Sequence, residues 1–166
     1  SNDEALVEIL SRTVDHDDVF AQSIANHGTV VLGLAPNNKT ENQNYLGKHG
    51  MVIQGDDPKL FVQPYIGMQN NLNILESESA GLGSMSIGND DVIVRTLPSF
   101  ENINGSLVPS LALEIVRVAI GASTYQVKSS NASSEQAFGE NTGINHVKLG
   151  SLIMPTNADG SFWLYP

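Results

Sequence analysis

The chain has 166 residues, the length of one domain with a sizeable hydrophobic core, and it contains no cysteine, which excludes disulfides and thiolate chemistry. Its 18 acidic and 8 basic residues give a formal net charge of -10. A field of this sign repels phosphate backbones and anionic membrane surfaces, so nucleic acid is excluded as an expected partner.

The sequence contains no candidate membrane span, because no apolar run approaches the ~18 residues that a transmembrane helix needs. It starts without Met, and Ser1 and Asn2 are typical of what remains after an expression tag is cleaved. We therefore expect the chain to be a piece of a longer protein.

The N-terminal part predicts two helices and a strand. Apolar residues recur at helical spacing from about Asp3 to Arg12, which predicts an amphipathic helix. A second helix is expected to begin in the acidic run 15–18 and to end at Gly28, with Phe20 and Ile24 on one face. The apolar segment 29–34 then predicts a strand. A helix that ends on glycine and leads directly into an apolar strand is typical of a layered α/β fold.

The acidic run Asp15, His16, Asp17 and Asp18 has two interpretations. A metal-dependent hydrolase would use such carboxylates and the imidazole together as ligands of a divalent ion. Neighbouring residues of a helix point in different directions, however, whereas Asp15 can cap the helix and Asp17 and Asp18 can interact favourably with its dipole. We expect the structural role. No cofactor or metal site is expected elsewhere, because the histidines do not have metal-binding spacing.

Two long polar segments, residues 35–58 and 129–145, predict loops, the first with a short strand at 51–54. Short elements are expected between and around them: extended pieces at 60–62 and 65–66, a brief helix over 72–79, and strands at 124–127 and 146–149.

The segment from Gly81 to Gly121 predicts the centre of the fold. Its first part predicts a β-hairpin, with a strand from Gly81, a tight turn at 88–91 and an apolar return strand at 92–97 that ends at Pro98. After a polar loop, Ser106 is expected to cap a helix that has Pro109 in its first turn and ends at Gly121.

Arg95 lies in the apolar return strand, where a guanidinium must find an acceptor or reach solvent. We expect an ion pair with Asp90 or Asp91 across the turn. The alternative is an anion-recognising group in a ligand pocket. Near the C-terminus, Trp163 and Tyr165 alternate as in a strand and are expected in the core or an interface rather than in a ligand cage.

Three short motifs follow one another along the chain. The first is an acidic start, a helix and an apolar strand over residues 17–33. The second is an acidic turn, an apolar run with arginine and a Pro-Ser-Leu-Ala-Leu segment, and the third is a pair of closing strands over residues 153–165. In this order they resemble the second type of CHASE domain, a sensory extracellular domain associated with bacterial cyclases and histidine kinases. The matching residues, for which we expect mainly structural roles, are Asp17, Asp18, Asp91, Arg95, Pro109, Leu111, Pro155, Asp159 and Gly160.

The sequence departs from the family pattern in two places. Val92 stands where the family usually has glycine after the turn aspartate, and residues 1–14 show no counterpart of the family's N-terminal strand-helix-strand portion. The resemblance therefore covers about the later two-thirds of a family domain.

The resemblance implies a non-enzymatic sensor on the periplasmic or extracellular face of a bacterial inner membrane. Its parent would carry membrane spans and an adenylate cyclase or histidine kinase output domain, sense a small molecule or peptide, and form a homodimer. The residues themselves show no nucleophile elbow or phosphate-binding loop. From them we predict a single α/β domain with a mixed sheet, packed helices and two long polar loops. The remaining alternatives are the metal-dependent hydrolase and a ligand-free dimerisation module.

Overall fold

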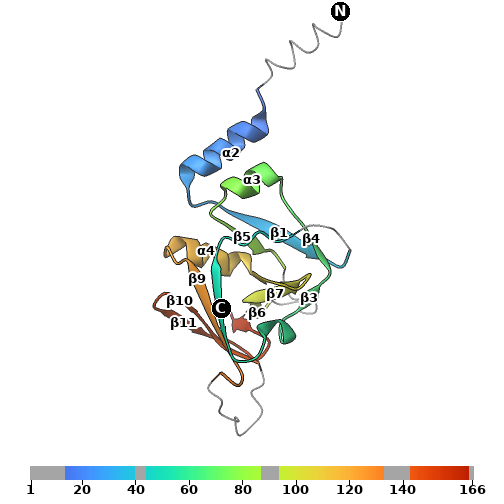
Figure 1. The fold of residues 1–166 in the computed structure, drawn as a ribbon, viewed down its shortest axis with the longest axis vertical. Coiled ribbons are helices and arrows are strands. Elements are labelled where there is room, and N and C mark those ends of the chain that lie inside the picture. The colour runs from blue at the N-terminus through green and yellow to red at the C-terminus, as the bar shows by residue number, and fades with distance from the viewer. Residues whose placement is uncertain (1–13, 40–43, 87–93, 133–142, 165–166) are drawn as a thin grey trace, which may run out of the picture.

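A computed structural model describes residues 14–39, 44–86, 94–132 and 143–164. Within these ranges, helices and short mixed sheets form a single α/β domain, as predicted (Figure 1). Helix α2 (His16–His27) projects from the body and packs against α3 (Asn73–Glu78), while α4 (Leu111–Ala119) lies among the strands. No helix in these four ranges is long and apolar enough to cross a membrane.

Helix α2 has the predicted boundaries. The Asp15 carboxylate accepts a hydrogen bond from the backbone N–H of Asp17 at 2.9 Å. At the other end, Gly28 adopts a left-handed conformation with φ of 75°, and its N–H donates to the carbonyl of Ile24 at 3.0 Å. Ile24 is buried, but Phe20 is 53% exposed. The rest of the protein therefore covers only part of the helix face on which both residues were predicted to lie. The helix predicted over 3–12 lies outside the described residues.

Strand β1 (Val31–Asn37) confirms the predicted apolar strand, extended by three residues at its end. It lies between β4 (Gly67–Gln69), which is antiparallel to it, and β5 (Gly81–Ser84), which is parallel. The predicted helix over 72–79 is confirmed as α3, which connects β4 to β5.

The predicted hairpin from Gly81 to Leu97 is wrong in the part that the structure describes. β5 pairs with β1, whereas β6 (Thr96–Pro98) pairs with β12 (Ser161–Trp163). The two predicted hairpin strands therefore belong to different sheets, because each finds a partner that is distant in sequence. The turn predicted at 88–91 lies outside the described residues.

A four-stranded sheet has the order β11-β10-β9-β2. It confirms the strands predicted at 51–54, 124–127 and 146–149, and the closing strand at Pro155. The strands are β2 (Gly50–Gln54), β9 (Thr124–Ser129), β10 (Ile144–Leu149) and β11 (Leu152–Pro155). β2 is parallel to β9, and the other two pairs are antiparallel.

The predicted start of the helix at Ser106 is wrong. Residues Ser106–Pro109 form strand β8, antiparallel to β7 (Phe100–Ile103), and β7 also pairs with β3 (Pro64–Tyr65). α4 begins after Ser110, whose hydroxyl accepts from the N–H of Leu113 at 3.4 Å. The predicted stop is confirmed, because Ile120 ends α4 and Gly121 has φ of 67°. The extended piece predicted at 60–62 is also wrong, since Pro58–Leu60 forms the 3-10 turn η1.

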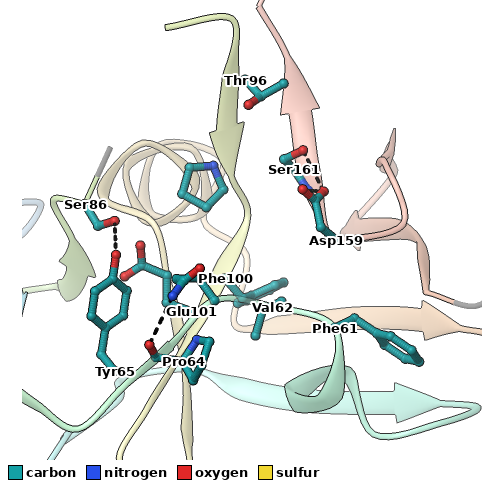
Figure 2. A pocket seen from close by; sticks show the side chains of 12 residues that line it. Phe61, Val62, Pro64, Tyr65, Ser86, Thr96, Phe100, Glu101, Asp159 and Ser161 are labelled. Atoms are coloured by element: carbon teal, nitrogen blue, oxygen red, sulfur yellow. Dashed lines mark hydrogen bonds between the residues drawn. The ribbon is translucent and has the colours of Figure 1, made fainter. Parts of the chain in front are cut away.

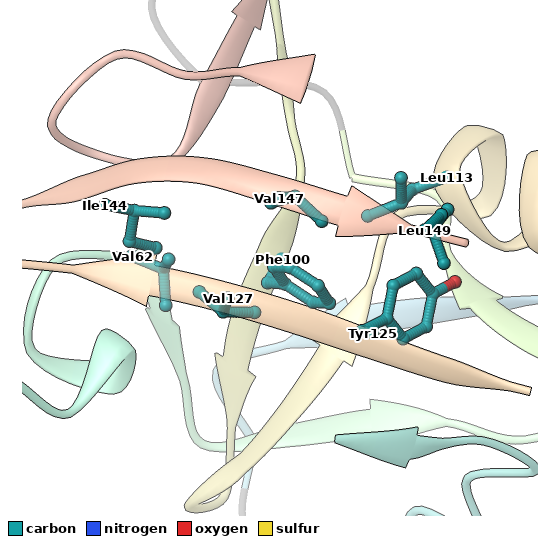
Figure 3. Packing of buried hydrophobic residues seen from close by; sticks show 8 residues of the cluster. All are labelled: Val62, Phe100, Leu113, Tyr125, Val127, Ile144, Val147 and Leu149. Carbon is teal, nitrogen blue, oxygen red and sulfur yellow. The ribbon is translucent and has the colours of Figure 1, made fainter. Parts of the chain in front are cut away.

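Two apolar clusters fill the interior. The larger one lies between α4 and the four-stranded sheet, and the rings of Phe100 and Tyr125 meet edge to face in it, with centroids 5.3 Å apart (Figure 3). The smaller one lies between β1 and β8 and includes Leu34, Leu82 and Val108. Between these clusters, β5 and α4 approach so closely that a Cβ on Gly83 would lie 2.6 Å from the Cα of Leu111.

Candidate functional site

A pocket of about 260 Å³ lies where β3, β6, β7 and β12 meet (Figure 2). Its wall combines apolar and aromatic side chains with hydroxyl, amide and carboxyl groups, as ligand pockets commonly do. Among the described residues that line it, none is Lys, Arg or His. They are Phe61, Val62, Gln63, Pro64, Tyr65, Ser86, Thr96, Pro98, Phe100, Glu101, Asp159 and Ser161.

Glu101 is the buried acid of this pocket. The residue is 1% exposed, and one carboxyl oxygen, Oε2, forms a short hydrogen bond with the Ser84 hydroxyl. The other oxygen, Oε1, has no hydrogen-bond partner among the described residues. An unsatisfied buried acceptor costs about 1–3 kcal/mol, so this oxygen is a place where a ligand donor would be favoured.

Two hydroxyls lie beside that carboxyl. The Tyr65 and Ser86 oxygens are hydrogen bonded to each other at 3.0 Å, and Figure 2 shows the Glu101 carboxyl next to this pair. Burial raises the pKa of Glu101, while the hydroxyls of Ser84 and Ser86 act in the opposite direction. Burial is the larger effect, so the pKa of Glu101 in the folded protein lies above its usual value.

Asp159 supplies the second carboxyl. Its Oδ1 accepts from the N–H and the hydroxyl of Ser161, at 2.9 and 2.7 Å, which orients the carboxylate at the start of β12. The neighbouring Gly160 has φ of 78°, and its carbonyl accepts from the N–H of Ser99 at 3.0 Å. Asp159 and Ser161 therefore form one wall of the pocket, together with Thr96 and Pro98 of β6.

Because the pKa of Glu101 is raised, replacing this residue with an uncharged one should change the free energy of unfolding by an amount that depends on pH. The folded state binds the proton more tightly than the unfolded chain, so the stabilisation that the protonated acid gives is present at low pH and is lost as the pH rises through the raised pKa. Glu101→Gln cannot ionise, and we expect its free energy of unfolding to increase relative to the wild type between about pH 4 and pH 8. Urea denaturation at several pH values measures this difference.

The matched control for this series is Glu78→Gln on the surface of α3, which removes one exposed carboxylate. A difference between wild type and Glu101→Gln that stays constant or shrinks with rising pH would contradict the buried, protonated acid.

A second buried polar cluster joins α4 to the sheet. Glu114 is 0% exposed and binds Arg117 through two hydrogen bonds, from Nε at 2.9 Å and from a terminal nitrogen at 2.7 Å. The Tyr125 hydroxyl also donates to Glu114, at 2.6 Å. Arg117 additionally donates to the carbonyls of Ala80 and Ala122, at 2.8 and 2.9 Å. The cluster is fully engaged within the protein, so its role is structural.

Tyr45 and His49 extend this cluster toward the surface. The Tyr45 hydroxyl and the His49 Nε2 are 3.0 Å apart, and the imidazole meets the Tyr125 ring edge to face at 4.8 Å. Burial is the main cause that raises the pKa of both tyrosines and lowers that of His49. These groups are therefore neutral near pH 7, and they hold the segment before β2 against β5 and β9 through Leu82 and Tyr125.

The structure places Arg95 outside an apolar strand, contrary to the prediction. Its side chain is exposed, β6 begins one residue later, and the Arg95 carbonyl accepts from the N–H of Leu164 at 2.8 Å. The predicted partners Asp90 and Asp91 lie outside the described residues. Trp163 is 57% exposed, so a place in the core is wrong for it, and Tyr165 is also outside the described part.

The other matched residues are spread over the fold. Asp17 and Asp18 lie in the first turn of α2, as predicted, and Pro155 ends β11. Pro109 and Leu111 flank the cap of α4 rather than both lying in the helix. Within the described ranges, no group of three or more His, Asp or Glu side chains is arranged to hold a metal ion.

Sequence reasoning missed Glu101, Glu114 and Tyr125. A faint signal exists for Glu101, because it stands between Phe100 and Ile103 in a short β-strand, but exposed glutamates have the same pattern. Comparison of the chain with models of known families gives no match, and neither the curated proteins nor the solved structures show a significant similarity to it.

Proposed function

We propose that this chain is a non-enzymatic sensory domain that binds a small molecule in the Glu101 pocket. The observation that carries the proposal is the unpartnered, buried oxygen of Glu101 in a pocket of mixed apolar and polar lining. A volume of about 260 Å³ lies just below the range of about 300–1,000 Å³ typical of pockets for drug-sized ligands, which favours a small metabolite.

The lining chemistry favours binding over catalysis. A nucleophilic mechanism needs a hydroxyl next to a base that is itself oriented by a third group. In this pocket, the Ser86 hydroxyl is hydrogen bonded to Tyr65, and among the described residues no histidine lines the pocket to serve as its base.

The setting follows from the family resemblance. The parent would be a bacterial transmembrane adenylate cyclase or histidine kinase, with this domain on the extracytoplasmic face and a dimeric arrangement. A ligand with different affinities for two arrangements of the domain would bias the output domain. Val19 and Phe20 on α2 are about half exposed and offer apolar area for the dimer contact.

Filling the pocket should abolish ligand binding. A ligand at about a hundred times its Kd stabilises the folded protein by ~2.7 kcal/mol, which raises the melting temperature by several degrees. Thr96→Phe places an aromatic side chain on β6 at the pocket wall, and we expect the variant to lose this stabilisation. Thermal denaturation with a panel of metabolites measures it.

Val52→Phe, at an exposed position of β2 outside the pocket, is the matched control and should keep the response. Flat melting curves with every metabolite, together with a concentration-dependent dimer in sedimentation, would overturn ligand sensing in favour of the assembly module. Stabilisation by a divalent metal that is lost on changing Asp17 and Asp18 to Ala would instead support the hydrolase.

A further inference from the structure

We propose that the ligand of the Glu101 pocket is a small organic cation, which places a primary ammonium group against Glu101, Ser86 and Tyr65. The inference rests on the proposed function and adds the chemical class of the ligand to it. It is drawn from the charges of the side chains that line the pocket, from the hydrogen-bond acceptors at one end of the pocket and from the apolar surface at its other end.

The charges in the wall have one sign. Glu101 and Asp159 contribute carboxyl groups, and no side chain that lines the pocket in the described part of the chain is basic. A ligand carboxylate or phosphate would therefore meet two acids without a compensating cation, which is unfavourable in a partly buried site. A cation meets the opposite situation, because an ionised carboxylate attracts it and its charge favours the ionisation of Glu101.

The acceptors next to Glu101 match the donors of an ammonium group. A primary ammonium has three N–H donors, and charge-assisted hydrogen bonds to carboxylates are the stronger kind. The unpartnered Oε1 of Glu101 and the oxygens of Ser86 and Tyr65 lie together (Figure 2). Each of the two hydroxyls keeps a free lone pair whichever of them donates to the other.

The remaining wall suits an apolar body. Phe61, Val62, Pro64 and Pro98 line the pocket beyond the hydroxyls, and Figure 2 shows Asp159, just before β12, and Ser161, its first residue, away from Glu101. The ligand is therefore amphipathic, with its charge at the β7 end. An alkylamine or arylalkylamine has this form.

Binding of a cation is linked to the proton on Glu101. In the free protein burial raises the pKa of Glu101, and a bound ammonium would lower it, so any proton on the carboxyl is released to water when the ligand binds. The other titratable groups of the pocket are Asp159 and the Tyr65 hydroxyl. Amine affinity should rise as the pH increases through the pKa of Glu101, whereas a neutral ligand that accepts a hydrogen bond from the protonated acid would show the reverse.

The test compares ligands that differ only in charge. Phenethylamine, phenethyl alcohol and phenylacetate share one skeleton, and isoamylamine with isoamyl alcohol forms a second set. By titration calorimetry we expect the amines to bind at least ~10-fold more tightly than the alcohols, and the carboxylate not to bind. Glu101→Gln should weaken amine binding by about 10–100-fold and remove its pH dependence, with little effect on the alcohol.

Two further variants keep the test independent of folding defects in Glu101→Gln. Tyr65→Phe should weaken the amine by about 3–10-fold through the loss of one acceptor. Glu78→Gln, outside the pocket, should bind like the wild type. If alcohols or carboxylates bind as tightly as the amines, or if amine affinity falls with rising pH, the inference is overturned while ligand sensing stands. If neither these probes nor the metabolite panel binds, both fail.

Discussion

Replacing Arg117 with Met is expected to lower the free energy of unfolding by about 3–5 kcal/mol, because it leaves the Glu114 carboxylate buried without its cation. The substitution also removes the hydrogen bonds to the carbonyls of Ala80 and Ala122, which connect α4 to the residues before β5 and β9. Met has a volume similar to that of Arg, so the loss of stability measures the missing polar interactions rather than a change in packing. Urea denaturation at neutral pH measures it.

The control for Arg117→Met is an ion pair of the same kind at the surface. Lys59 and Asp57 are 3.4 Å apart, with side chains that are 37% and 46% exposed. Lys59→Met should cost less than about 1 kcal/mol. The double variant Glu114→Gln with Arg117→Met should recover part of the loss, because no charge is then buried. A loss below about 1 kcal/mol for Arg117→Met alone would show that the pair is not isolated from water.

Replacing Gly83 with Ala is expected to cost about 3 kcal/mol, at the upper end of the range typical of overpacking. The new Cβ would lie 2.6 Å from the Cα and 2.9 Å from the backbone nitrogen of Leu111. These are main-chain atoms in the first turn of α4, so the whole helix must move away from β5. Thermal and urea denaturation measure the loss.

Gly33 is a matched control, because it is the register partner of Gly83 in the pair of β1 with β5. A Cβ there would lie 2.4 Å from the sulfur of Met85, the far end of a flexible and exposed side chain. Gly33→Ala should therefore cost clearly less than Gly83→Ala. Equal losses would indicate that both positions suffer from a backbone effect instead of the contact with α4.

Local signals in the sequence predicted the boundaries of α2 correctly. A capping carboxylate at Asp15 and a left-handed glycine at Gly28 act within one turn of the chain, so the sequence alone specifies them. The strands of the four-stranded sheet were found for a similar reason, since short segments that are apolar or alternate apolar and polar residues are recognisable wherever they pair.

Pairing between distant segments was not predictable in the same way. The segment after Gly81 and the segment before Pro98 have the composition of a hairpin, yet each pairs elsewhere, with β1 and with β12. Packing between the layers of the fold decides which strands pair, and this packing cannot be recognised from a single sequence. Pro109 shows the same limit, because a proline suits both the first turn of a helix and the end of a strand.

Of the residues that line the candidate pocket, sequence reasoning selected only Asp159, through the family resemblance and without assigning it a ligand. Glu101 was missed because a glutamate in a short strand is usually exposed, and its burial follows from the tertiary fold. Arg95 was overvalued for the opposite reason, since the apolar run around it suggested a buried strand, whereas its side chain is exposed and β6 starts after it.

Strand β5 lies against two of the buried acids, Glu114 and Glu101. At one end a Cβ on Gly81 would lie 2.2 Å from an oxygen of Glu114, and at the other end Ser84 is hydrogen bonded to Glu101. All four residues of the strand are buried, so it has little space in which to deform. A ligand bound to Glu101 would therefore be one hydrogen bond away, through Ser84, from the strand on which α4 packs.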